Sequence, residues 1–91
     1  MMAITKHVLV SGRVQGVGYR AWTQHEASLR DLVGWVRNCD DGRVEAILHG
    51  SPDAVEAMLD TMRQGPTIAQ VEEIVVRDAD APQTGHFEVT R

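Results

Sequence analysis

The feature that most constrains the fold is a hairpin in the middle of the chain, with a predicted helix on each side. Two runs rich in β-forming residues, VGWVRNC (33–39) and RVEAILHG (43–50), are separated by an Asp-Asp-Gly turn. An Asp-Gly turn between such runs is a strong signal for an antiparallel β-hairpin. Strand patterns also precede the first helix at 4–11 and follow the second at 71–78, and HFEVT (86–90) adds a short segment. The predicted order is therefore β-α-β-β-α-β with a short fifth strand.

The two helices differ in how clearly the sequence defines them. The second is predicted to begin after the N-cap Ser51 and to stop at Gly65-Pro66, since serine caps helix N-termini and glycine followed by proline ends helices. Its apolar face repeats at helical spacing and consists of Val55, Met58, Leu59 and Met62. The first helix is predicted from about Arg20 to Arg30, and its best apolar stripe is Ala21, His25, Ser28, Leu29 and Leu32, with Trp22 beside it. Both helices are expected on one face of an antiparallel sheet, in an α+β, ferredoxin-like βαββαβ sandwich.

Length and charge limit the functions open to the chain. Its 91 residues are predicted to form a single domain, residues 1–91. The net charge of −4 and the pI near 5.4 argue against diffuse attraction to nucleic acid or an anionic membrane, so an anion needs a local positive site. No secretory signal is visible, nor an apolar run of the ~20 residues that span a bilayer, which predicts a cytoplasmic protein. The single cysteine, Cys39, excludes an internal disulfide and a multi-thiolate metal site.

A glycine-rich stretch, GRVQGVGYR (12–20), joins the first strand to the first helix. Glycines allow successive backbone N–H groups to point inward, and the helix N-terminus adds positive potential, so this geometry suits an anion. The spacing matches neither of the common nucleotide-binding motifs. Arg20 is a cation where the helix dipole disfavours one, at a cost of roughly 0.3–1 kcal/mol unless an anion compensates. A solvated surface arginine is the ordinary alternative, but the combination favours an anion site.

Few other residues indicate chemistry. Asn38 stands at the end of GWVRN, where spacing alone favours a turn-initiating role. The functional alternative is an amide that hydrogen-bonds a water or a substrate. The histidines are scattered without metal-ligand spacing and are expected to be solvated or structural: His7, His25, His49 and His86. No metal site is predicted, and Cys39 is expected to be a free thiol near a strand end.

The stretches GRVQGVGYR, GWVRN and DGRVE, in this order and at these separations, resemble the acylphosphatase family, small enzymes that hydrolyse the carboxyl–phosphate bond of acyl phosphates. The resemblance covers nearly the whole chain and continues with Gly50, Gly65-Pro66 and Phe87. It implies the same sandwich with a fifth strand, and a catalytic pair formed by Arg20 and Asn38. It also implies that the loop backbone holds the phosphate, through Gln15, Gly16, Val17, Gly18, Tyr19 and Arg20. The implied partners are a small acyl phosphate and inorganic phosphate, with no metal and no organic cofactor.

The reaction expected from this resemblance is direct attack of water on phosphorus. The loop and Arg20 hold the phosphoryl group, and Asn38 orients the water. Three positions depart from the usual residues of the family. Tyr19 replaces a phenylalanine and is expected to be a packing ring with a solvated edge. Arg30-Asp31 stands where a glycine often follows the first helix, and Cys39 where a small hydroxylated residue is sometimes found.

Two alternative functions share the predicted fold. One is a non-catalytic anion-binding or regulatory module, which phosphate binding without turnover would favour. The other is an RNA-recognition domain, which needs paired aromatics on the central strands and a basic surface. RVEAILHG contains no aromatic residue and the chain is acidic, so the enzyme is the favoured interpretation. Nothing in the sequence indicates an obligate oligomer, and a monomer is expected.

Overall fold

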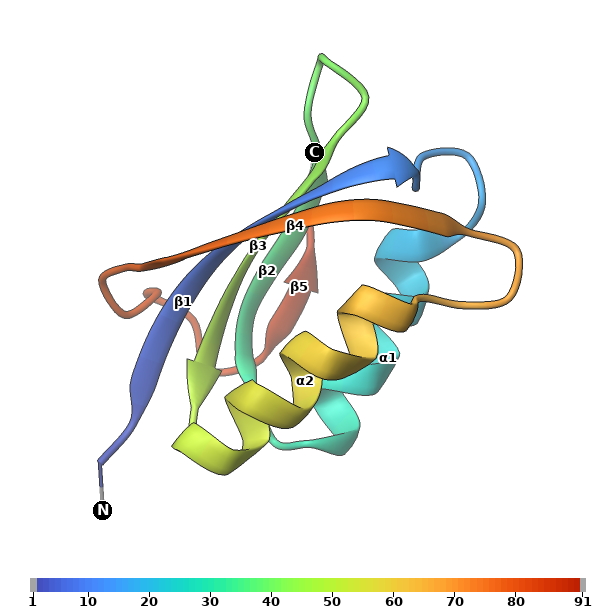
Figure 1. Cartoon of the computed structure of the whole chain (residues 1–91). Coiled ribbons are helices and arrows are strands. Elements are labelled where there is room, and N and C mark those ends of the chain that lie inside the picture. Colours follow the sequence, from blue (N-terminus) through green and yellow to red (C-terminus); the bar gives the residue numbers. More distant parts are fainter. Residues whose placement is uncertain (1, 91) are drawn as a thin grey trace.

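The computed structural model describes residues 2–90, and within them five strands form one sheet that two helices cover (Figure 1). The elements in chain order are β1 (Ile4–Arg13), α1 (Tyr19–Leu29), β2 (Val33–Asn38), β3 (Val44–Gly50), α2 (Pro52–Gln64), β4 (Gln70–Asp78) and β5 (Phe87–Val89). The sheet order is β4-β1-β3-β2-β5. Neighbouring strands are antiparallel except β2 and β5, which run parallel. The predicted α+β sandwich is confirmed, and the short C-terminal strand departs from its antiparallel pattern.

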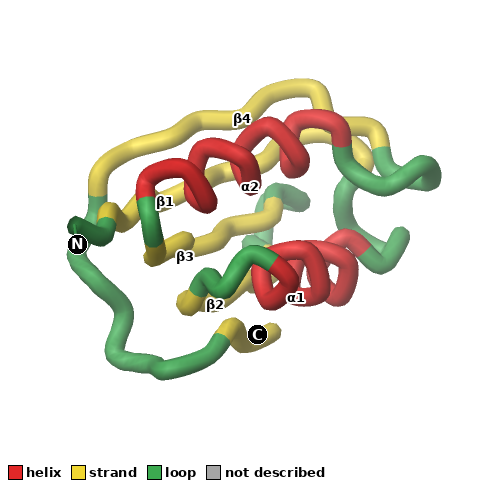
Figure 2. The backbone as a smooth tube through the Cα atoms, turned by 90° about the horizontal axis from the view of Figure 1, so that it is seen from below, coloured by secondary structure: helices red, strands yellow, loops and turns green. Residues whose placement is uncertain are grey.

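The core lies between the sheet and the helical layer. The helix α1 contacts β2 and β5, whereas α2 contacts β1, β3 and β4, so the two helices share one face of the sheet (Figure 2). Strand residues that point toward the helices are completely buried: Val8, Val10, Val36, Val44, Ala46 and Leu48. This arrangement follows from the period of two along each strand, which sends alternate side chains to the covered face. The predicted apolar face of α2 is buried as expected, at Val55, Met58, Leu59 and Met62.

The predicted stripe of α1 is wrong. The helix buries Tyr19, Thr23 and Ala27, which are spaced by four residues, whereas Leu29 of the predicted stripe is 66% exposed. Leu32 is buried, but it lies beyond the helix end. The reason is steric, because the small side chains of Thr23 and Ala27 let the helix approach the sheet closely while the larger Tyr19 fills the space near the glycine loop. A prediction from apolar character alone therefore gives the wrong buried face for α1.

The end of α1 places a non-glycine residue in the left-handed region. Asp31 has a φ of 57°. The amides of Asp31 and Leu32 donate to the carbonyls of Ser28 (3.2 Å) and Ala27 (3.0 Å), which is the paired pattern of a Schellman motif. Asp31 thus occupies the position where glycine is the usual residue, and the buried Leu32 follows it.

Replacing Asp31 with glycine is expected to raise the free energy of unfolding by about 0.5–1 kcal/mol, because a Cβ is unfavourable at this φ. Thermal or denaturant unfolding measures the change. The carboxylate also lies near the negative end of the helix dipole, so Asp31→Asn serves as the control that removes only the charge. If asparagine stabilises the protein as much as glycine does, charge and not backbone strain is the cause.

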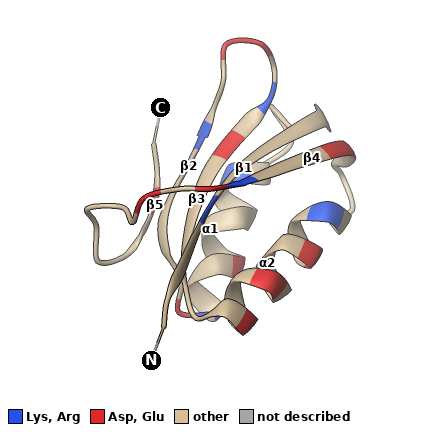
Figure 3. Ribbon diagram, turned by 60° about the vertical axis from the view of Figure 1, so that its left-hand side comes forward, with Lys and Arg blue, Asp and Glu red and all other residues tan. Residues whose placement is uncertain are grey.

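The exposed side of α2 carries acidic side chains at Asp53, Glu56 and Asp60 (Figure 3). They fit the negative net charge of the chain. Neither helix of residues 2–90 has both the length and the apolar character that crossing a membrane requires.

Candidate active site

The loop between β1 and α1 owes its shape to two glycines in the left-handed region. Gly16 has a φ of 75° and Gly18 a φ of 77°, which L side chains rarely adopt. A Cβ built on either glycine meets no atom within 4 Å. The glycines therefore serve the backbone conformation and not close packing, and the space above them is open to a ligand.

The N-terminus of α1 presents unused hydrogen-bond donors. Its N-cap, Gly18, makes no side-chain cap, and no acidic residue lies in the first turn. The amide of Trp22 donates to the carbonyl of Gly18 at 3.0 Å. Within residues 2–90, the amides of the three preceding residues, Tyr19, Arg20 and Ala21, have no acceptor. Free N–H groups and the positive end of a helix dipole together favour an anion here.

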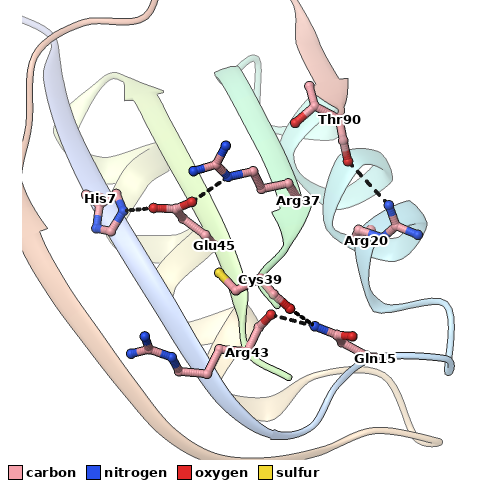
Figure 4. A network of polar contacts seen from close by, with 8 residues as sticks. All are labelled: His7, Gln15, Arg20, Arg37, Cys39, Arg43, Glu45 and Thr90. Carbon is pink, nitrogen blue, oxygen red and sulfur yellow. Dashed lines mark hydrogen bonds and ion pairs between the residues drawn. The ribbon is translucent and has the colours of Figure 1, made fainter. Parts of the chain in front are cut away.

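Arg20 and Asn38 lie at one pocket of about 190 Å³. Its lining consists of Val14, Gly16, Gly18, Tyr19, Arg20, Ala21, Asn38 and Val89. Among the described residues this set contains one cation and no carboxylate, so these side chains favour an anion. The Arg20 guanidinium is oriented by the C-terminal segment, since its Nη1 donates to the carbonyl of Thr90 at 3.3 Å (Figure 4).

Asn38 lines this pocket and carries a buried side-chain oxygen without a partner. It is the last residue of β2 and pairs with Val44 of β3. Its Oδ1 is buried and has no hydrogen-bond partner among the described residues. Buried polar atoms without partners are rare because they cost free energy, so a hydrogen-bond donor bound next to this oxygen would stabilise the site. A water molecule or a hydroxyl group has the donor that it needs.

The structure gathers most, but not all, of the sequence-predicted site residues. Gly16, Gly18, Tyr19, Arg20 and Asn38 line the pocket, whereas Gln15 and Val17 do not. Val17 packs against the hydrophobic core. The side chain of Gln15 turns toward the β2–β3 hairpin, where its Nε2 donates to the carbonyls of Cys39 (2.8 Å) and Arg43 (2.9 Å) (Figure 4).

Tyr19 does not have the solvated edge that was expected. It is 1% exposed, and its hydroxyl donates to the carbonyl of Met62 at 2.9 Å. Burial raises the pKa of the Tyr19 hydroxyl far above its ordinary value. The hydroxyl is satisfied by α2, so a tyrosine fits where a phenylalanine is more usual. It anchors the start of α1, next to the loop, to the second helix.

Cys39 and three of the histidines have local partners or structural surroundings. The Cys39 thiol is free and follows β2, as expected, and burial together with the Glu45 and Asp41 carboxylates raises its pKa. His7 contacts Glu45 at 2.6 Å on the uncovered face of the sheet (Figure 4). His49 contacts Thr5 at 2.7 Å, and His86 contacts Glu88 at 3.0 Å. In the part of the chain that the structure describes, no group of three or more His, Cys, Asp or Glu side chains is arranged to hold a metal ion.

The contribution of the C-terminal strand to the pocket was missed by sequence reasoning. Val89 lines the pocket and the Thr90 carbonyl accepts from Arg20. The Thr90 amide donates to the Val36 carbonyl at 2.8 Å, which fixes this segment beside β2. The contact with Arg20 uses the main chain and joins residues 70 positions apart, so no side-chain motif could signal it.

Comparisons of the sequence and of the structure with known proteins find the same family. A family model described as acylphosphatase matches residues 6–89. The acylphosphatase of Alcanivorax borkumensis is 63% identical, and the match covers 94% of this chain and 98% of that protein. The crystal structure of acylphosphatase from Bacillus subtilis has a TM-score of 0.91 at 35% identity, over 99% of this chain and 100% of that one. A Coxiella burnetii acylphosphatase has a TM-score of 0.92 at 31% identity, over 97% and 93%.

Proposed function

This chain belongs to the acylphosphatase family and hydrolyses the carboxyl–phosphate bond of acyl phosphates, and we propose that it does so by direct attack of water on phosphorus in the Arg20–Asn38 pocket. The observation that carries this proposal is a pocket lined both by the positive cradle and by Asn38, whose buried Oδ1 has no partner among the described residues. One part suits a phosphoryl group, and the other suits the water that attacks it.

In this proposal the phosphoryl oxygens are held by the free amides of the loop and of the first turn of α1, together with the Arg20 guanidinium. Arginine matches phosphate oxygens in a bidentate geometry. The donors are oriented without a ligand, because Gly16 and Gly18 allow the left-handed backbone of the loop and the Thr90 carbonyl accepts a hydrogen bond from Arg20. Such preorganised donors stabilise the charge that develops in the transition state, and removing a single one typically costs about 10²–10³-fold in rate.

The Asn38 amide is assigned the orientation of the attacking water. Its Oδ1 accepts a hydrogen bond from the water, but a neutral amide is too weak a base to remove the proton. Its contribution is therefore positional. The leaving group is a carboxylate, whose conjugate acid has a low pKa, so it departs with little help from a general acid. Phosphoryl transfer depends mainly on positioning and electrostatics, which this set of residues can supply.

We also propose a reaction that needs no metal ion, since the amides and Arg20 supply positive charge and the leaving group needs no activation. The Gln15 and Val17 amides complete the proposed phosphate loop. That the protein is a monomer, lies in the cytoplasm and has a single domain stays a prediction from the sequence.

Hydrolysis of an aromatic acyl phosphate in ¹⁸O-labelled water tests the proposed chemistry. Attack on phosphorus places the label in inorganic phosphate and leaves the carboxylate unlabelled, as mass spectrometry of both products can measure. Label in the carboxylate would contradict the proposal, because it would mean attack on the acyl carbon. Under the same conditions ATP and simple phosphate esters should be hydrolysed at least about a hundredfold more slowly, since no carboxylic acid, histidine or cysteine is among the described residues that line the pocket. Phosphate binding without turnover of any of these compounds would favour the regulatory module.

A further inference from the structure

We propose that Gln15 is a positioning residue that sets the distance between the phosphate cradle and Asn38. This inference rests on the role proposed above for Asn38. The two halves of the pocket come from different elements, since the cradle belongs to the β1–α1 loop and Asn38 belongs to the β2–β3 hairpin. Catalysis by orientation requires these halves to stand in a fixed relation, because a displacement of about 1 Å can cost on the order of 10²-fold in rate.

The sheet does not supply this fixed relation at the end of β1. Pairing between β1 and β3 stops at Val10 and Val44. From there β1 continues alongside β4 as far as Arg13, past an irregularity between Ser11 and Gly12. The loop therefore leaves the sheet next to β4, on the side away from β2. Another contact has to hold it against the hairpin that carries Asn38.

The Gln15 carboxamide makes that contact. Its Nε2 donates to the carbonyls of Cys39 at 2.8 Å and Arg43 at 2.9 Å (Figure 4). These two residues close the hairpin turn, since the Cys39 amide donates to the Arg43 carbonyl at 2.8 Å. Among residues 2–90, these are the only hydrogen bonds between the glycine loop and the hairpin turn. Cys39 directly follows Asn38, so the amide plane of Gln15 fixes the backbone next to the Asn38 side chain.

The same geometry excludes the Gln15 side chain as a phosphate ligand. A primary carboxamide nitrogen has two hydrogens, and each is used by one hairpin carbonyl. Its remaining polar atom is an oxygen, which an anion repels. The Gln15 side chain therefore has no free donor for a phosphate, and in this proposal it acts through Asn38.

Replacing Gln15 with methionine removes the two donors and keeps the length of the side chain. The fold should tolerate this change, because the Arg43 carbonyl keeps the Cys39 amide as a donor and the Cys39 carbonyl keeps the Gly42 amide at 3.3 Å. We expect kcat for an aromatic acyl phosphate to fall about 10- to 100-fold, while the inhibition constant of inorganic phosphate changes by less than about twofold. Gln24→Met is the matched control. It removes a hydrogen bond from Nε2 to the Phe87 carbonyl (3.0 Å) and should leave kcat within about twofold.

The Asn38→Ala background decides whether Gln15 acts through Asn38. In that background Gln15→Met should have almost no further effect on kcat, since no oriented amide is left to misplace. An equal loss in both backgrounds would overturn the inference, and so would a phosphate affinity that falls in parallel with kcat. If Gln15→Met does not fold, Gln15→Asn gives the same test, because its shorter amide cannot reach both carbonyls. Unchanged kcat in Asn38→Ala itself would refute the proposed function, whereas unchanged kcat in Gln15→Met alone would refute only this inference.

Discussion

Replacing Arg20 with alanine should abolish both the binding of inorganic phosphate and the hydrolysis of acyl phosphates. Among residues 2–90, Arg20 is the one charged side chain in the lining of the pocket, so its removal takes away the charge that these residues supply to an anion. A transition-state donor is worth about 10²–10³ in rate, and a guanidinium that also binds the ground-state phosphate contributes to affinity as well. We therefore expect kcat/KM to fall by about 10³-fold or more, measured with an aromatic acyl phosphate.

Phosphate binding by the Arg20→Ala variant can be read independently of catalysis from thermal unfolding. A ligand at a hundred times its Kd stabilises the folded state by about 2.7 kcal/mol, so phosphate should raise the Tm of the wild-type protein and leave that of Arg20→Ala unchanged. Arg63→Ala is the matched control, because it also removes one positive charge from a helix. Arg63 is exposed on α2 and pairs with Asp60 at 3.1 Å. A variant lacking Arg20 that keeps its phosphate response would show that the backbone amides alone bind the anion.

The position of Arg20 lowers the stability of the fold but suits the binding of an anion. A cation in the first turn of α1 faces the positive end of the helix dipole, which costs roughly 0.3–1 kcal/mol in the absence of an anion. The Thr90 carbonyl offsets part of this cost by accepting a hydrogen bond. We expect phosphate binding at the proposed site to remove this electrostatic cost, because Arg20 and the amides of the first turn would then share one negative ligand.

The parts of the fold that the sequence predicts are those with local signals. The bounds of α2 follow from Ser51, whose side chain accepts from the Ala54 amide at 3.2 Å, and from Gly65, which ends the helix. The buried face of α1 could not be found in this way. It depends on Tyr19, whose hydroxyl bonds to a carbonyl of α2 that is 43 residues away. The parallel pairing of β5 with β2 is equally non-local, since it depends on the path of the segment between β4 and β5.

The residues of the site also differ in whether a local sequence signal reveals them. Arg20 is conspicuous in the sequence because a cation at a helix start conflicts with a local rule. Asn38 is not conspicuous, since asparagine before a turn is ordinary, and only the family resemblance pointed to it. What distinguishes Asn38 physically is a buried oxygen without a partner among the described residues, on a residue that lines the same pocket as the glycine loop, and that arrangement exists only in the folded protein. Gln15 was assigned to the phosphate loop for its place in the motif, but its side chain faces the hairpin.

Replacing Asn38 with alanine should lower kcat by about 10²–10³-fold while inorganic phosphate still binds. The variant keeps every group of the cradle and loses only the proposed holder of the water, so the loss belongs to the chemical step. Stability should not fall with activity. The Asn38 Oδ1 is buried without a partner in the part of the chain that the structure describes, and removing an unsatisfied buried oxygen relieves a cost instead of adding one. Steady-state kinetics, phosphate inhibition and denaturant unfolding of the same preparation separate these three quantities.

The Asn38→Asp variant sharpens the test, because it keeps an oxygen at the same place and adds a negative charge beside the anion. If orientation of water by an acceptor were sufficient, aspartate would support catalysis. We expect instead that it loses phosphate affinity by at least about tenfold as well as kcat, since two negative groups then share a pocket of about 190 Å³. Alanine should thus separate binding from turnover, whereas aspartate should impair both. A loss of phosphate affinity in Asn38→Ala equal to its loss of kcat would instead place Asn38 in the cradle, and the attacking water would need another holder.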